Sequence, residues 1–306
     1  MSYFVYILLN NVVPLSLLIG LGVVLQWKFK LDIKTLSKLN FYLFSPAIMF
    51  QMLYQSELSL KIMSQVLLFF VVFFFTMFGL VELVMRIGNY RPGMRSAMRN
   101  SVIFYNSANY AIPLNQLVFV GDPFTLSIQI IIMMMQNLLP NTYGVYSVNA
   151  HKQKLRETMK TILSLPGIYV IPVAFLMRGF HVPVPHPLYV TIDYIAKGFI
   201  AIALVTLGIQ LGSMKWKLKL RDVAISNILR LCVGPLLGFL IVLAFGFEGD
   251  MAKALILSCA VPTSLSSVLL AVEFDNEPEF ASQAVFSSTL FSIFTVTLVI
   301  YLIQFV

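Results

Sequence analysis

One apolar stretch, residues 101–121, limits the folds open to this chain more than any other. It is long enough to span a bilayer, yet several asparagines and a proline lie near its middle. Because proline has no backbone N–H and clashes with the preceding turn, we expect a helix to break just before Pro113. Broken backbone is tolerated within a membrane only where protein or a water-filled cavity satisfies the freed polar groups. The stretch is therefore a candidate binding site.

A second stretch, residues 255–274, repeats this design. Its apolar flanks surround Pro262, which is followed by Thr263 and three serines. Pro113 and Pro262 are separated by close to half of the 306-residue chain. The sequence therefore predicts two halves, each built around one broken helix.

Composition places the chain among integral membrane proteins. Hydrophobic residues make up 59% of it and charged residues only 11%, whereas soluble domains carry about 25% charged residues. The apolar runs are continuous, which favours helices over the alternating strands of a barrel. The net charge of +8 is attributed to loop residues and not to nucleic-acid binding. Cys232 and Cys259 both lie in apolar runs, so neither a disulfide framework nor a metal site is expected, and no cofactor is predicted.

The distribution of basic residues supports ten spans and sets their direction. Lysines and arginines gather in alternate loops, for example at Lys28, Lys30, Arg86 and Arg91. The positive-inside rule places these loops in the cytoplasm and both termini outside it. Without a basic leader or a cleavage site, the first span is expected to remain in the mature protein. The expected spans are residues 4–27, 33–54, 62–85, 101–121, 124–148, 162–177, 188–211, 223–245, 255–274 and 280–306.

We therefore predict an all-α integral membrane protein built from two inverted five-helix repeats. Residues 1–150 form the first repeat, residues 151–161 a cytoplasmic linker, and residues 162–306 the second repeat. The broken helices 4 and 9 are expected to run in opposite directions and to cross at their prolines. Each second half-helix would then begin near the bilayer centre with proline in its first turn. Two positive helix ends aimed at one point would favour an anion.

A series of residues in or beside spans 4, 7, 9 and 10 matches a known family pattern, namely Asn106, Pro113, Leu114, Gly121, Asp193, Tyr194, Leu207, Gly208, Ala260, Val261, Pro262, Glu273, Phe274, Pro278, Ser288 and Thr289. With these residues the chain resembles the auxin efflux carrier family, whose bacterial members include malate and malonate carriers. The resemblance implies a fold related to sodium/proton antiporters and bile-acid transporters. It also implies a scaffold of helices 1, 2, 6 and 7 and a moving transport domain of helices 3–5 and 8–10. Ala111 and Ala203 depart from the family pattern, which has glycine and proline there.

The predicted substrate site draws on amides, hydroxyls and prolines of helices 4, 5 and 9. Each residue type also has an ordinary structural interpretation. The amides could pair neighbouring helices, the hydroxyls could bond to carbonyls one turn earlier, and the prolines could be simple kinks. The predicted site residues are Asn106, Asn109, Pro113, Gln136, Asn137, Pro262, Thr263, Ser264 and Ser266.

Charged residues within the spans are few. Asp193 and Lys197 share one face of helix 7, either as an internal ion pair or as a coupling and anion-attracting pair. Arg230 is expected to extend towards the cytoplasmic surface, and Glu82 to pair with Arg86. Neither broken stretch holds a carboxylate at its centre. This absence favours an anionic substrate over a sodium or proton site at the crossing. Coupling could still come from Asp193, from sodium held by neutral oxygens, or from protonation of the substrate.

The predicted function is a secondary-active or facilitative carrier of an organic anion in the bacterial inner (plasma) membrane. The substrate would be a carboxylate such as malate, malonate or an auxin-like acid, moved by elevator-type alternating access. A channel or a substrate-sensing receptor on the same scaffold is the alternative. No catalytic arrangement is present in the spans, so an enzyme is not expected. Related carriers suggest a homodimer through the scaffold.

Overall fold

The computed structural model describes residues 3–56, 58–148, 163–214 and 220–306. These residues form helices and no named strand, which confirms the all-α expectation. Six of the helices are long and apolar enough to cross a membrane, and the shorter Gly167–Gly179 is also apolar. The six are Val5–Phe29, Leu60–Ile87, Pro123–Gly144, His186–Gly212, Arg221–Phe245 and Pro278–Phe305.

The elements of the first half occupy residues 3–148. They are α1 (Tyr3–Ile7), η1 (Leu8–Val12), α2 (Val13–Phe29), α3 (Ile33–Leu39), η2 (Asn40–Phe44), α4 (Ser45–Gln55), α5 (Leu60–Ile87), α6 (Pro92–Ile103), η3 (Ser107–Ala111), α7 (Ile112–Val118), α8 (Pro123–Leu139), η4 (Pro140–Gly144) and α9 (Val145–Ser147).

Among the described residues, the named elements of the second half run from Gly167 to Phe305. They are α11 (Gly167–Gly179), α12 (His186–Gly212), α13 (Leu220–Ile228), η5 (Leu229–Val233), α14 (Gly234–Phe245), α15 (Gly249–Cys259), α16 (Ser266–Glu273), α17 (Pro278–Leu302) and η6 (Ile303–Phe305).

Four prolines in the described helices are preceded by π-helical turns and not by breaks. Each of η1, η2, η3 and η5 is followed by an α-helix whose second residue is a proline: Pro14, Pro46, Pro113 and Pro235. A π turn is wider than an α turn. We attribute its presence here to the proline ring, which would otherwise clash with the carbonyl four residues earlier. The expected break just before Pro113 is therefore wrong, because helical backbone runs from Ser107 through Pro113.

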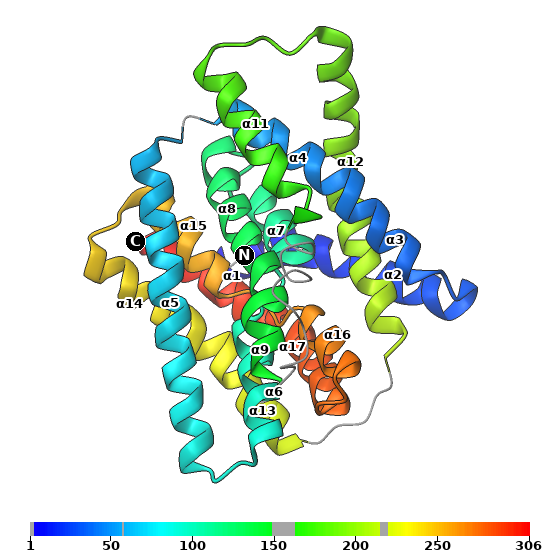
Figure 1. The fold of residues 1–306 in the computed structure, drawn as a ribbon, viewed down its shortest axis with the longest axis vertical. Helices are drawn as coiled ribbons and strands as arrows, with labels where there is room; N and C mark the ends of the chain where they lie inside the picture. The colour runs from blue at the N-terminus through cyan, green and yellow to red at the C-terminus, as the bar shows by residue number, and fades with distance from the viewer. Residues whose placement is uncertain (1–2, 57, 149–162, 215–219) are drawn as a thin grey trace.

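A close pair of helices, α2 and α12, lies on one side of the molecule (Figure 1). Two glycines let their backbones touch. A Cβ atom on Gly22 would lie 2.2 Å from the Val205 carbonyl oxygen, and one on Gly208 would lie 2.0 Å from the Ile19 carbonyl oxygen. Small residues allow this kind of approach in membrane helices, where lipid gives no hydrophobic drive for association. Within the pair, α12 also packs with α4, which in turn contacts α11.

An ion pair and hydrogen bonds connect the remaining helices at the end of the molecule that carries the basic loops. Arg91 pairs with Glu277 at 3.3 Å, and Asn276 donates to the Ser96 hydroxyl at 2.8 Å. The Tyr90 hydroxyl donates to Asp222 at 2.8 Å. Burial, and then this hydrogen bond, raise the pKa of the Tyr90 phenol above its ordinary value.

Glu82 forms ion pairs with three arginines at the same end. The expected pair with Arg86 is confirmed at 2.8 Å. Arg95 and Arg99, from the first turns of α6, contact the same carboxylate. These contacts join α5 to α6 just before the first broken stretch.

Candidate functional site

The two broken stretches meet in the interior. α6 ends at Ile103 and α15 ends at Cys259, and the extended residues that follow them run antiparallel. Tyr105 and Thr263 form an isolated β-bridge. The Asn106 N–H donates to the Pro262 carbonyl at 2.8 Å, and the Ser264 N–H donates to the Phe104 carbonyl at 2.8 Å. Backbone groups freed from the helices therefore satisfy one another, as a membrane interior requires.

The position of this crossover corrects the predicted geometry in two ways. The first break lies at residues 104–106, so Pro113 is not at the crossing but in the first turn of α7. Pro262 does lie at the crossing, but it precedes α16 by four residues and is not in that helix's first turn. The two stretches consequently cross at unequal distances from their prolines.

Neighbouring side chains complete the hydrogen bonding of the crossover. The Thr263 N–H donates to the Ser288 hydroxyl at 3.1 Å, and the Thr263 hydroxyl donates to the Ser101 carbonyl at 2.8 Å. The Gln136 amide accepts from the Tyr105 N–H at 3.3 Å and donates to the Ile103 carbonyl at 3.2 Å. Thr263 and Gln136 thus act as substitutes for the missing helical partners.

Arg230 is buried at the crossover, and its expected extension to the surface is wrong. Its side chain is 0% exposed. The guanidinium donates to the Val102 carbonyl at 3.0 Å and to the Cys259 carbonyl. These carbonyls lie at the C-terminal ends of α6 and α15, where each helix presents about half a negative charge. One cation therefore neutralises two negative helix ends, and the Tyr105 ring packs against it at 4.6 Å.

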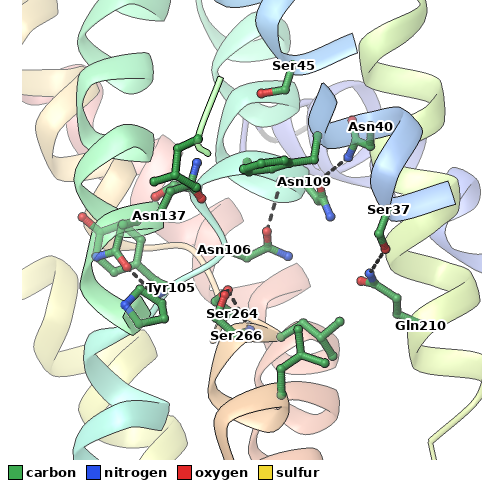
Figure 2. Close-up of a pocket in the computed structure, with 18 of the residues that line it drawn as sticks. Ser37, Asn40, Ser45, Tyr105, Asn106, Asn109, Asn137, Gln210, Ser264 and Ser266 are labelled. Atoms are coloured by element: carbon green, nitrogen blue, oxygen red, sulfur yellow. Dashed lines mark hydrogen bonds between the residues drawn. The ribbon is translucent and has the colours of Figure 1, made fainter. Parts of the chain in front are cut away.

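A cavity of about 510 Å³ borders the crossover (Figure 2). Six of the nine predicted site residues line it, namely Asn106, Asn109, Gln136, Asn137, Ser264 and Ser266. Pro113, Pro262 and Thr263 are not among its lining residues. The two prolines and Thr263 therefore shape the backbone or support it from behind.

The residues of the opposite wall of the cavity are not among the predicted site residues. Ser37, Asn40 and Ser45 line it from α3 to the start of α4, and Gln210 lines it from α12. The first two are three residues apart and thus share a helix face, which is a signal that the sequence does contain. Glu273, at the end of α16, lines the same cavity.

Hydrogen bonds link the two walls and order the polar side chains (Figure 2). The Asn40 amide donates to the Asn109 side-chain oxygen at 2.7 Å. The Asn106 side-chain oxygen accepts from the Asn109 N–H at 3.1 Å, which caps the start of η3. Ser264 accepts from the Ser266 N–H at 3.3 Å, near the start of α16. Two helix N-terminal ends therefore border one cavity.

The described residues that line the cavity are almost all uncharged. Its described lining residues include no lysine, arginine or histidine, and Glu273 is the only carboxylate among them. The first N–H groups of a helix have no intrahelical partners and carry about half a positive charge together. Among the groups that line the cavity, backbone N–H groups are therefore the source of positive potential at the crossover end.

The Asp193–Lys197 ion pair is confirmed, with 2.6 Å between Lys197 Nζ and Asp193 Oδ2. Asp193 also accepts a hydrogen bond from Gln51 at 2.8 Å. Neither Asp193 nor Lys197 is among the cavity-lining residues. An internal ion pair therefore explains the positions of these two side chains. The predicted linker, residues 151–161, lies outside the described residues.

Comparison with models of protein families gives a match over the second half of the chain. Residues 159–300, just under half of the chain, match the model of a family described as "Membrane transport protein". No curated protein matches the chain. The match agrees with the resemblance noted for the sequence, over the second half only. Together with the six long apolar helices, it indicates a multi-pass membrane protein whose second half is similar to membrane transport proteins.

Proposed function

We propose that this protein is a carrier for an organic anion, with the anion held at the crossover by two helix N-terminal ends. The observation that carries the proposal is that the negative helix ends at the crossover have a charged partner, whereas the positive helix ends have none among the described lining residues. Arg230 neutralises the two negative helix ends at the crossover. The two positive ends, near Asn106 and Ser264, have no resident carboxylate beside them among the described residues. A carboxylate of the substrate would complete the site.

The chemistry of the lining supports the same choice. Amides and hydroxyls can donate hydrogen bonds to carboxylate oxygens, and the aromatic and aliphatic residues between them can cover an organic body. Phe41, Leu165, Phe199 and Leu269 are among these apolar lining residues. The cavity volume, about 510 Å³, lies within the usual range for small-molecule sites.

Elevator-type alternating access fits the position of the cavity between two groups of helices. One wall belongs to α3, η2 and α12, and the other to the crossover and α16. Movement of the crossover past α12 would break the Asn40–Asn109 hydrogen bond and carry the anion site with it. Ser37, Gln210 and Glu273 lie near helix ends on the side of the basic loops. By the positive-inside rule this side is cytoplasmic, so the described conformation would be inward-facing in a cell membrane.

Ligand-induced thermal stabilisation of the purified protein tests the anion site. Monocarboxylates, dicarboxylates, indole acids and their neutral amides would be compared. We expect carboxylates to raise the melting temperature, since a ligand that binds only the folded state stabilises it. Asn106→Ala should remove the shift, while Asn10→Ala, at an exposed asparagine away from the cavity, should retain it. Stabilisation by neutral or cationic compounds alone would refute the proposal.

Counterflow in proteoliposomes separates a carrier from the alternatives. A carrier is expected to exchange internal for external labelled anion in a saturable way. Unitary conductance would identify a channel, and binding without flux would identify a receptor. Replacement of Asn106 should abolish the exchange while leaving membrane insertion intact.

A further inference from the structure

We infer that Glu273 sets the charge of the substrate, so that the cavity accepts a compound with one carboxylate and rejects a dicarboxylate. This inference rests on the proposed anion site and adds a selectivity element at its other end. It concerns the one charged side chain among the described residues that line the cavity.

Glu273 and the anion site lie at opposite ends of one short helix. α16 begins at Ser266, beside the crossover, and ends at Glu273. Seven residues at a rise of 1.5 Å place the two Cα atoms roughly 10 Å apart. The Cα–Cβ bonds of a helix tilt towards its N-terminus, which in α16 is the end beside the crossover. A substrate bound at the crossover and extending along α16 would therefore approach Glu273.

The basic residues that the structure describes at that end of the molecule have partners other than Glu273. Arg91 pairs with Glu277, and Arg95 and Arg99 pair with Glu82. None of the ion pairs between described residues includes Glu273. The side chain of Glu273 is exposed, and the residue lines the cavity wall.

This arrangement has different consequences for three classes of substrate. A second carboxylate at the far end of a ligand would lie near Glu273 and be repelled by it. At about 7 Å and an effective dielectric constant of roughly 30 to 40, the repulsion corresponds to roughly tenfold weaker binding. A neutral end would be unaffected, and an ammonium group would be attracted. The cavity therefore suits a monocarboxylate whose far end is neutral or cationic, and not a malate-like dianion.

The test compares three probes of equal length: valerate, glutarate and 5-aminovalerate. Their dissociation constants are measured on the wild type, on Glu273→Gln and on Asp275→Asn. Glu273 is exposed, so the amide is not expected to disturb folding. Asp275 is an exposed acid two residues further on that is not among the lining residues, which makes it a matched control for general surface charge.

We expect Glu273→Gln to tighten glutarate binding roughly tenfold, to leave valerate within twofold, and to weaken 5-aminovalerate, with no change in Asp275→Asn. An unchanged glutarate-to-valerate ratio in Glu273→Gln would overturn the inference and leave the anion site standing. An equal effect of Asp275→Asn would also overturn it, since the cause would then be surface charge. If none of the probes binds the wild type, the anion site itself is refuted.

Discussion

The α2–α12 pair and the crossover bring the two halves of the chain together by opposite means. In the α2–α12 pair both helices are continuous at the contact, and Gly22 and Gly208 remove the side chains that would keep the backbones apart. At the crossover the side chains remain and the helices themselves are interrupted, at residues 104–106 and 260–265.

This difference explains why one contact is structural and the other can bind a ligand. A continuous helix uses its backbone hydrogen bonds internally, so a glycine contact leaves no polar group for a ligand. An interrupted helix frees N–H and carbonyl groups, which must find partners nearby. At the crossover the carbonyls find Arg230, while the helix starts beside Asn106 and Ser264 face a cavity. Substitutions at the two contacts test this difference.

The largest effect is expected from Gly22→Ala. The added methyl carbon would lie 2.2 Å from the Val205 carbonyl oxygen, so the helices must separate. We expect a loss of roughly 3 kcal/mol in the free energy of unfolding, measured in detergent by thermal or denaturant melting. Gly20→Ala is the matched control, because no atom lies within 4 Å of its added carbon. Equal melting of the two variants would contradict the glycine contact.

Arg230→Met should be less severe, with a loss of roughly 2 kcal/mol. The substitution leaves the Val102 and Cys259 carbonyls without their donor, although removal of a buried charge offsets part of the cost. Arg230→Lys should recover part of the stability, because it retains the charge. Arg86→Met is the control, since Glu82 keeps Arg95 and Arg99. A stable Arg230→Met variant with unaltered carboxylate binding would show that the helix ends do not need this cation.

Thr263→Val and Ser266→Ala should separate support of the crossover from ligand contact. Thr263→Val loses the hydrogen bond to the Ser101 carbonyl, so we expect a loss of about 1 kcal/mol in stability and carboxylate binding within twofold of the wild type. Ser266 lines the cavity, so Ser266→Ala should weaken carboxylate binding with little change in melting. The reverse pattern would exchange the roles assigned to these two residues.

The smallest effect is expected at the hydrogen bond between the cavity walls. A double-mutant cycle of Asn40→Ala and Asn109→Ala should give a coupling free energy of about 0.5 to 1 kcal/mol. The free energy of unfolding of all four proteins supplies the measurement. Strictly additive losses would mean that the 2.7 Å contact adds no stability to the described conformation.

Much of the site could be predicted from the sequence, because polar residues in an apolar stretch have few alternatives to an interior position. Asn106, Asn109 and Ser264 were placed at the cavity on this ground, and the geometry brings them together there. The Asp193–Lys197 pair followed from helical spacing alone. Gln136 and Asn137 also reach the cavity, although Gln136 is shared with the crossover backbone.

What could not be predicted depends on backbone geometry and on contacts distant in sequence. Proline was expected to end a helix, but a π turn before Pro113 lets the helical backbone continue. The buried position of Arg230 could not be predicted, because its two carbonyl partners belong to α6 and α15, which come together only in the fold. The wall formed by Ser37, Asn40 and Gln210 likewise requires knowledge of which helix faces the crossover.

The position of a bound anion tests the central claim most directly. The measurement is an anomalous-scattering difference map from crystals of the protein grown with a brominated carboxylic acid that stabilises it in solution. The account predicts bromine density inside the cavity, with the carboxylate oriented towards Asn106 and Ser264 and lost in Asn106→Ala crystals. Density confined to the basic loops, or beside the Asp193–Lys197 pair with the cavity empty, would contradict it.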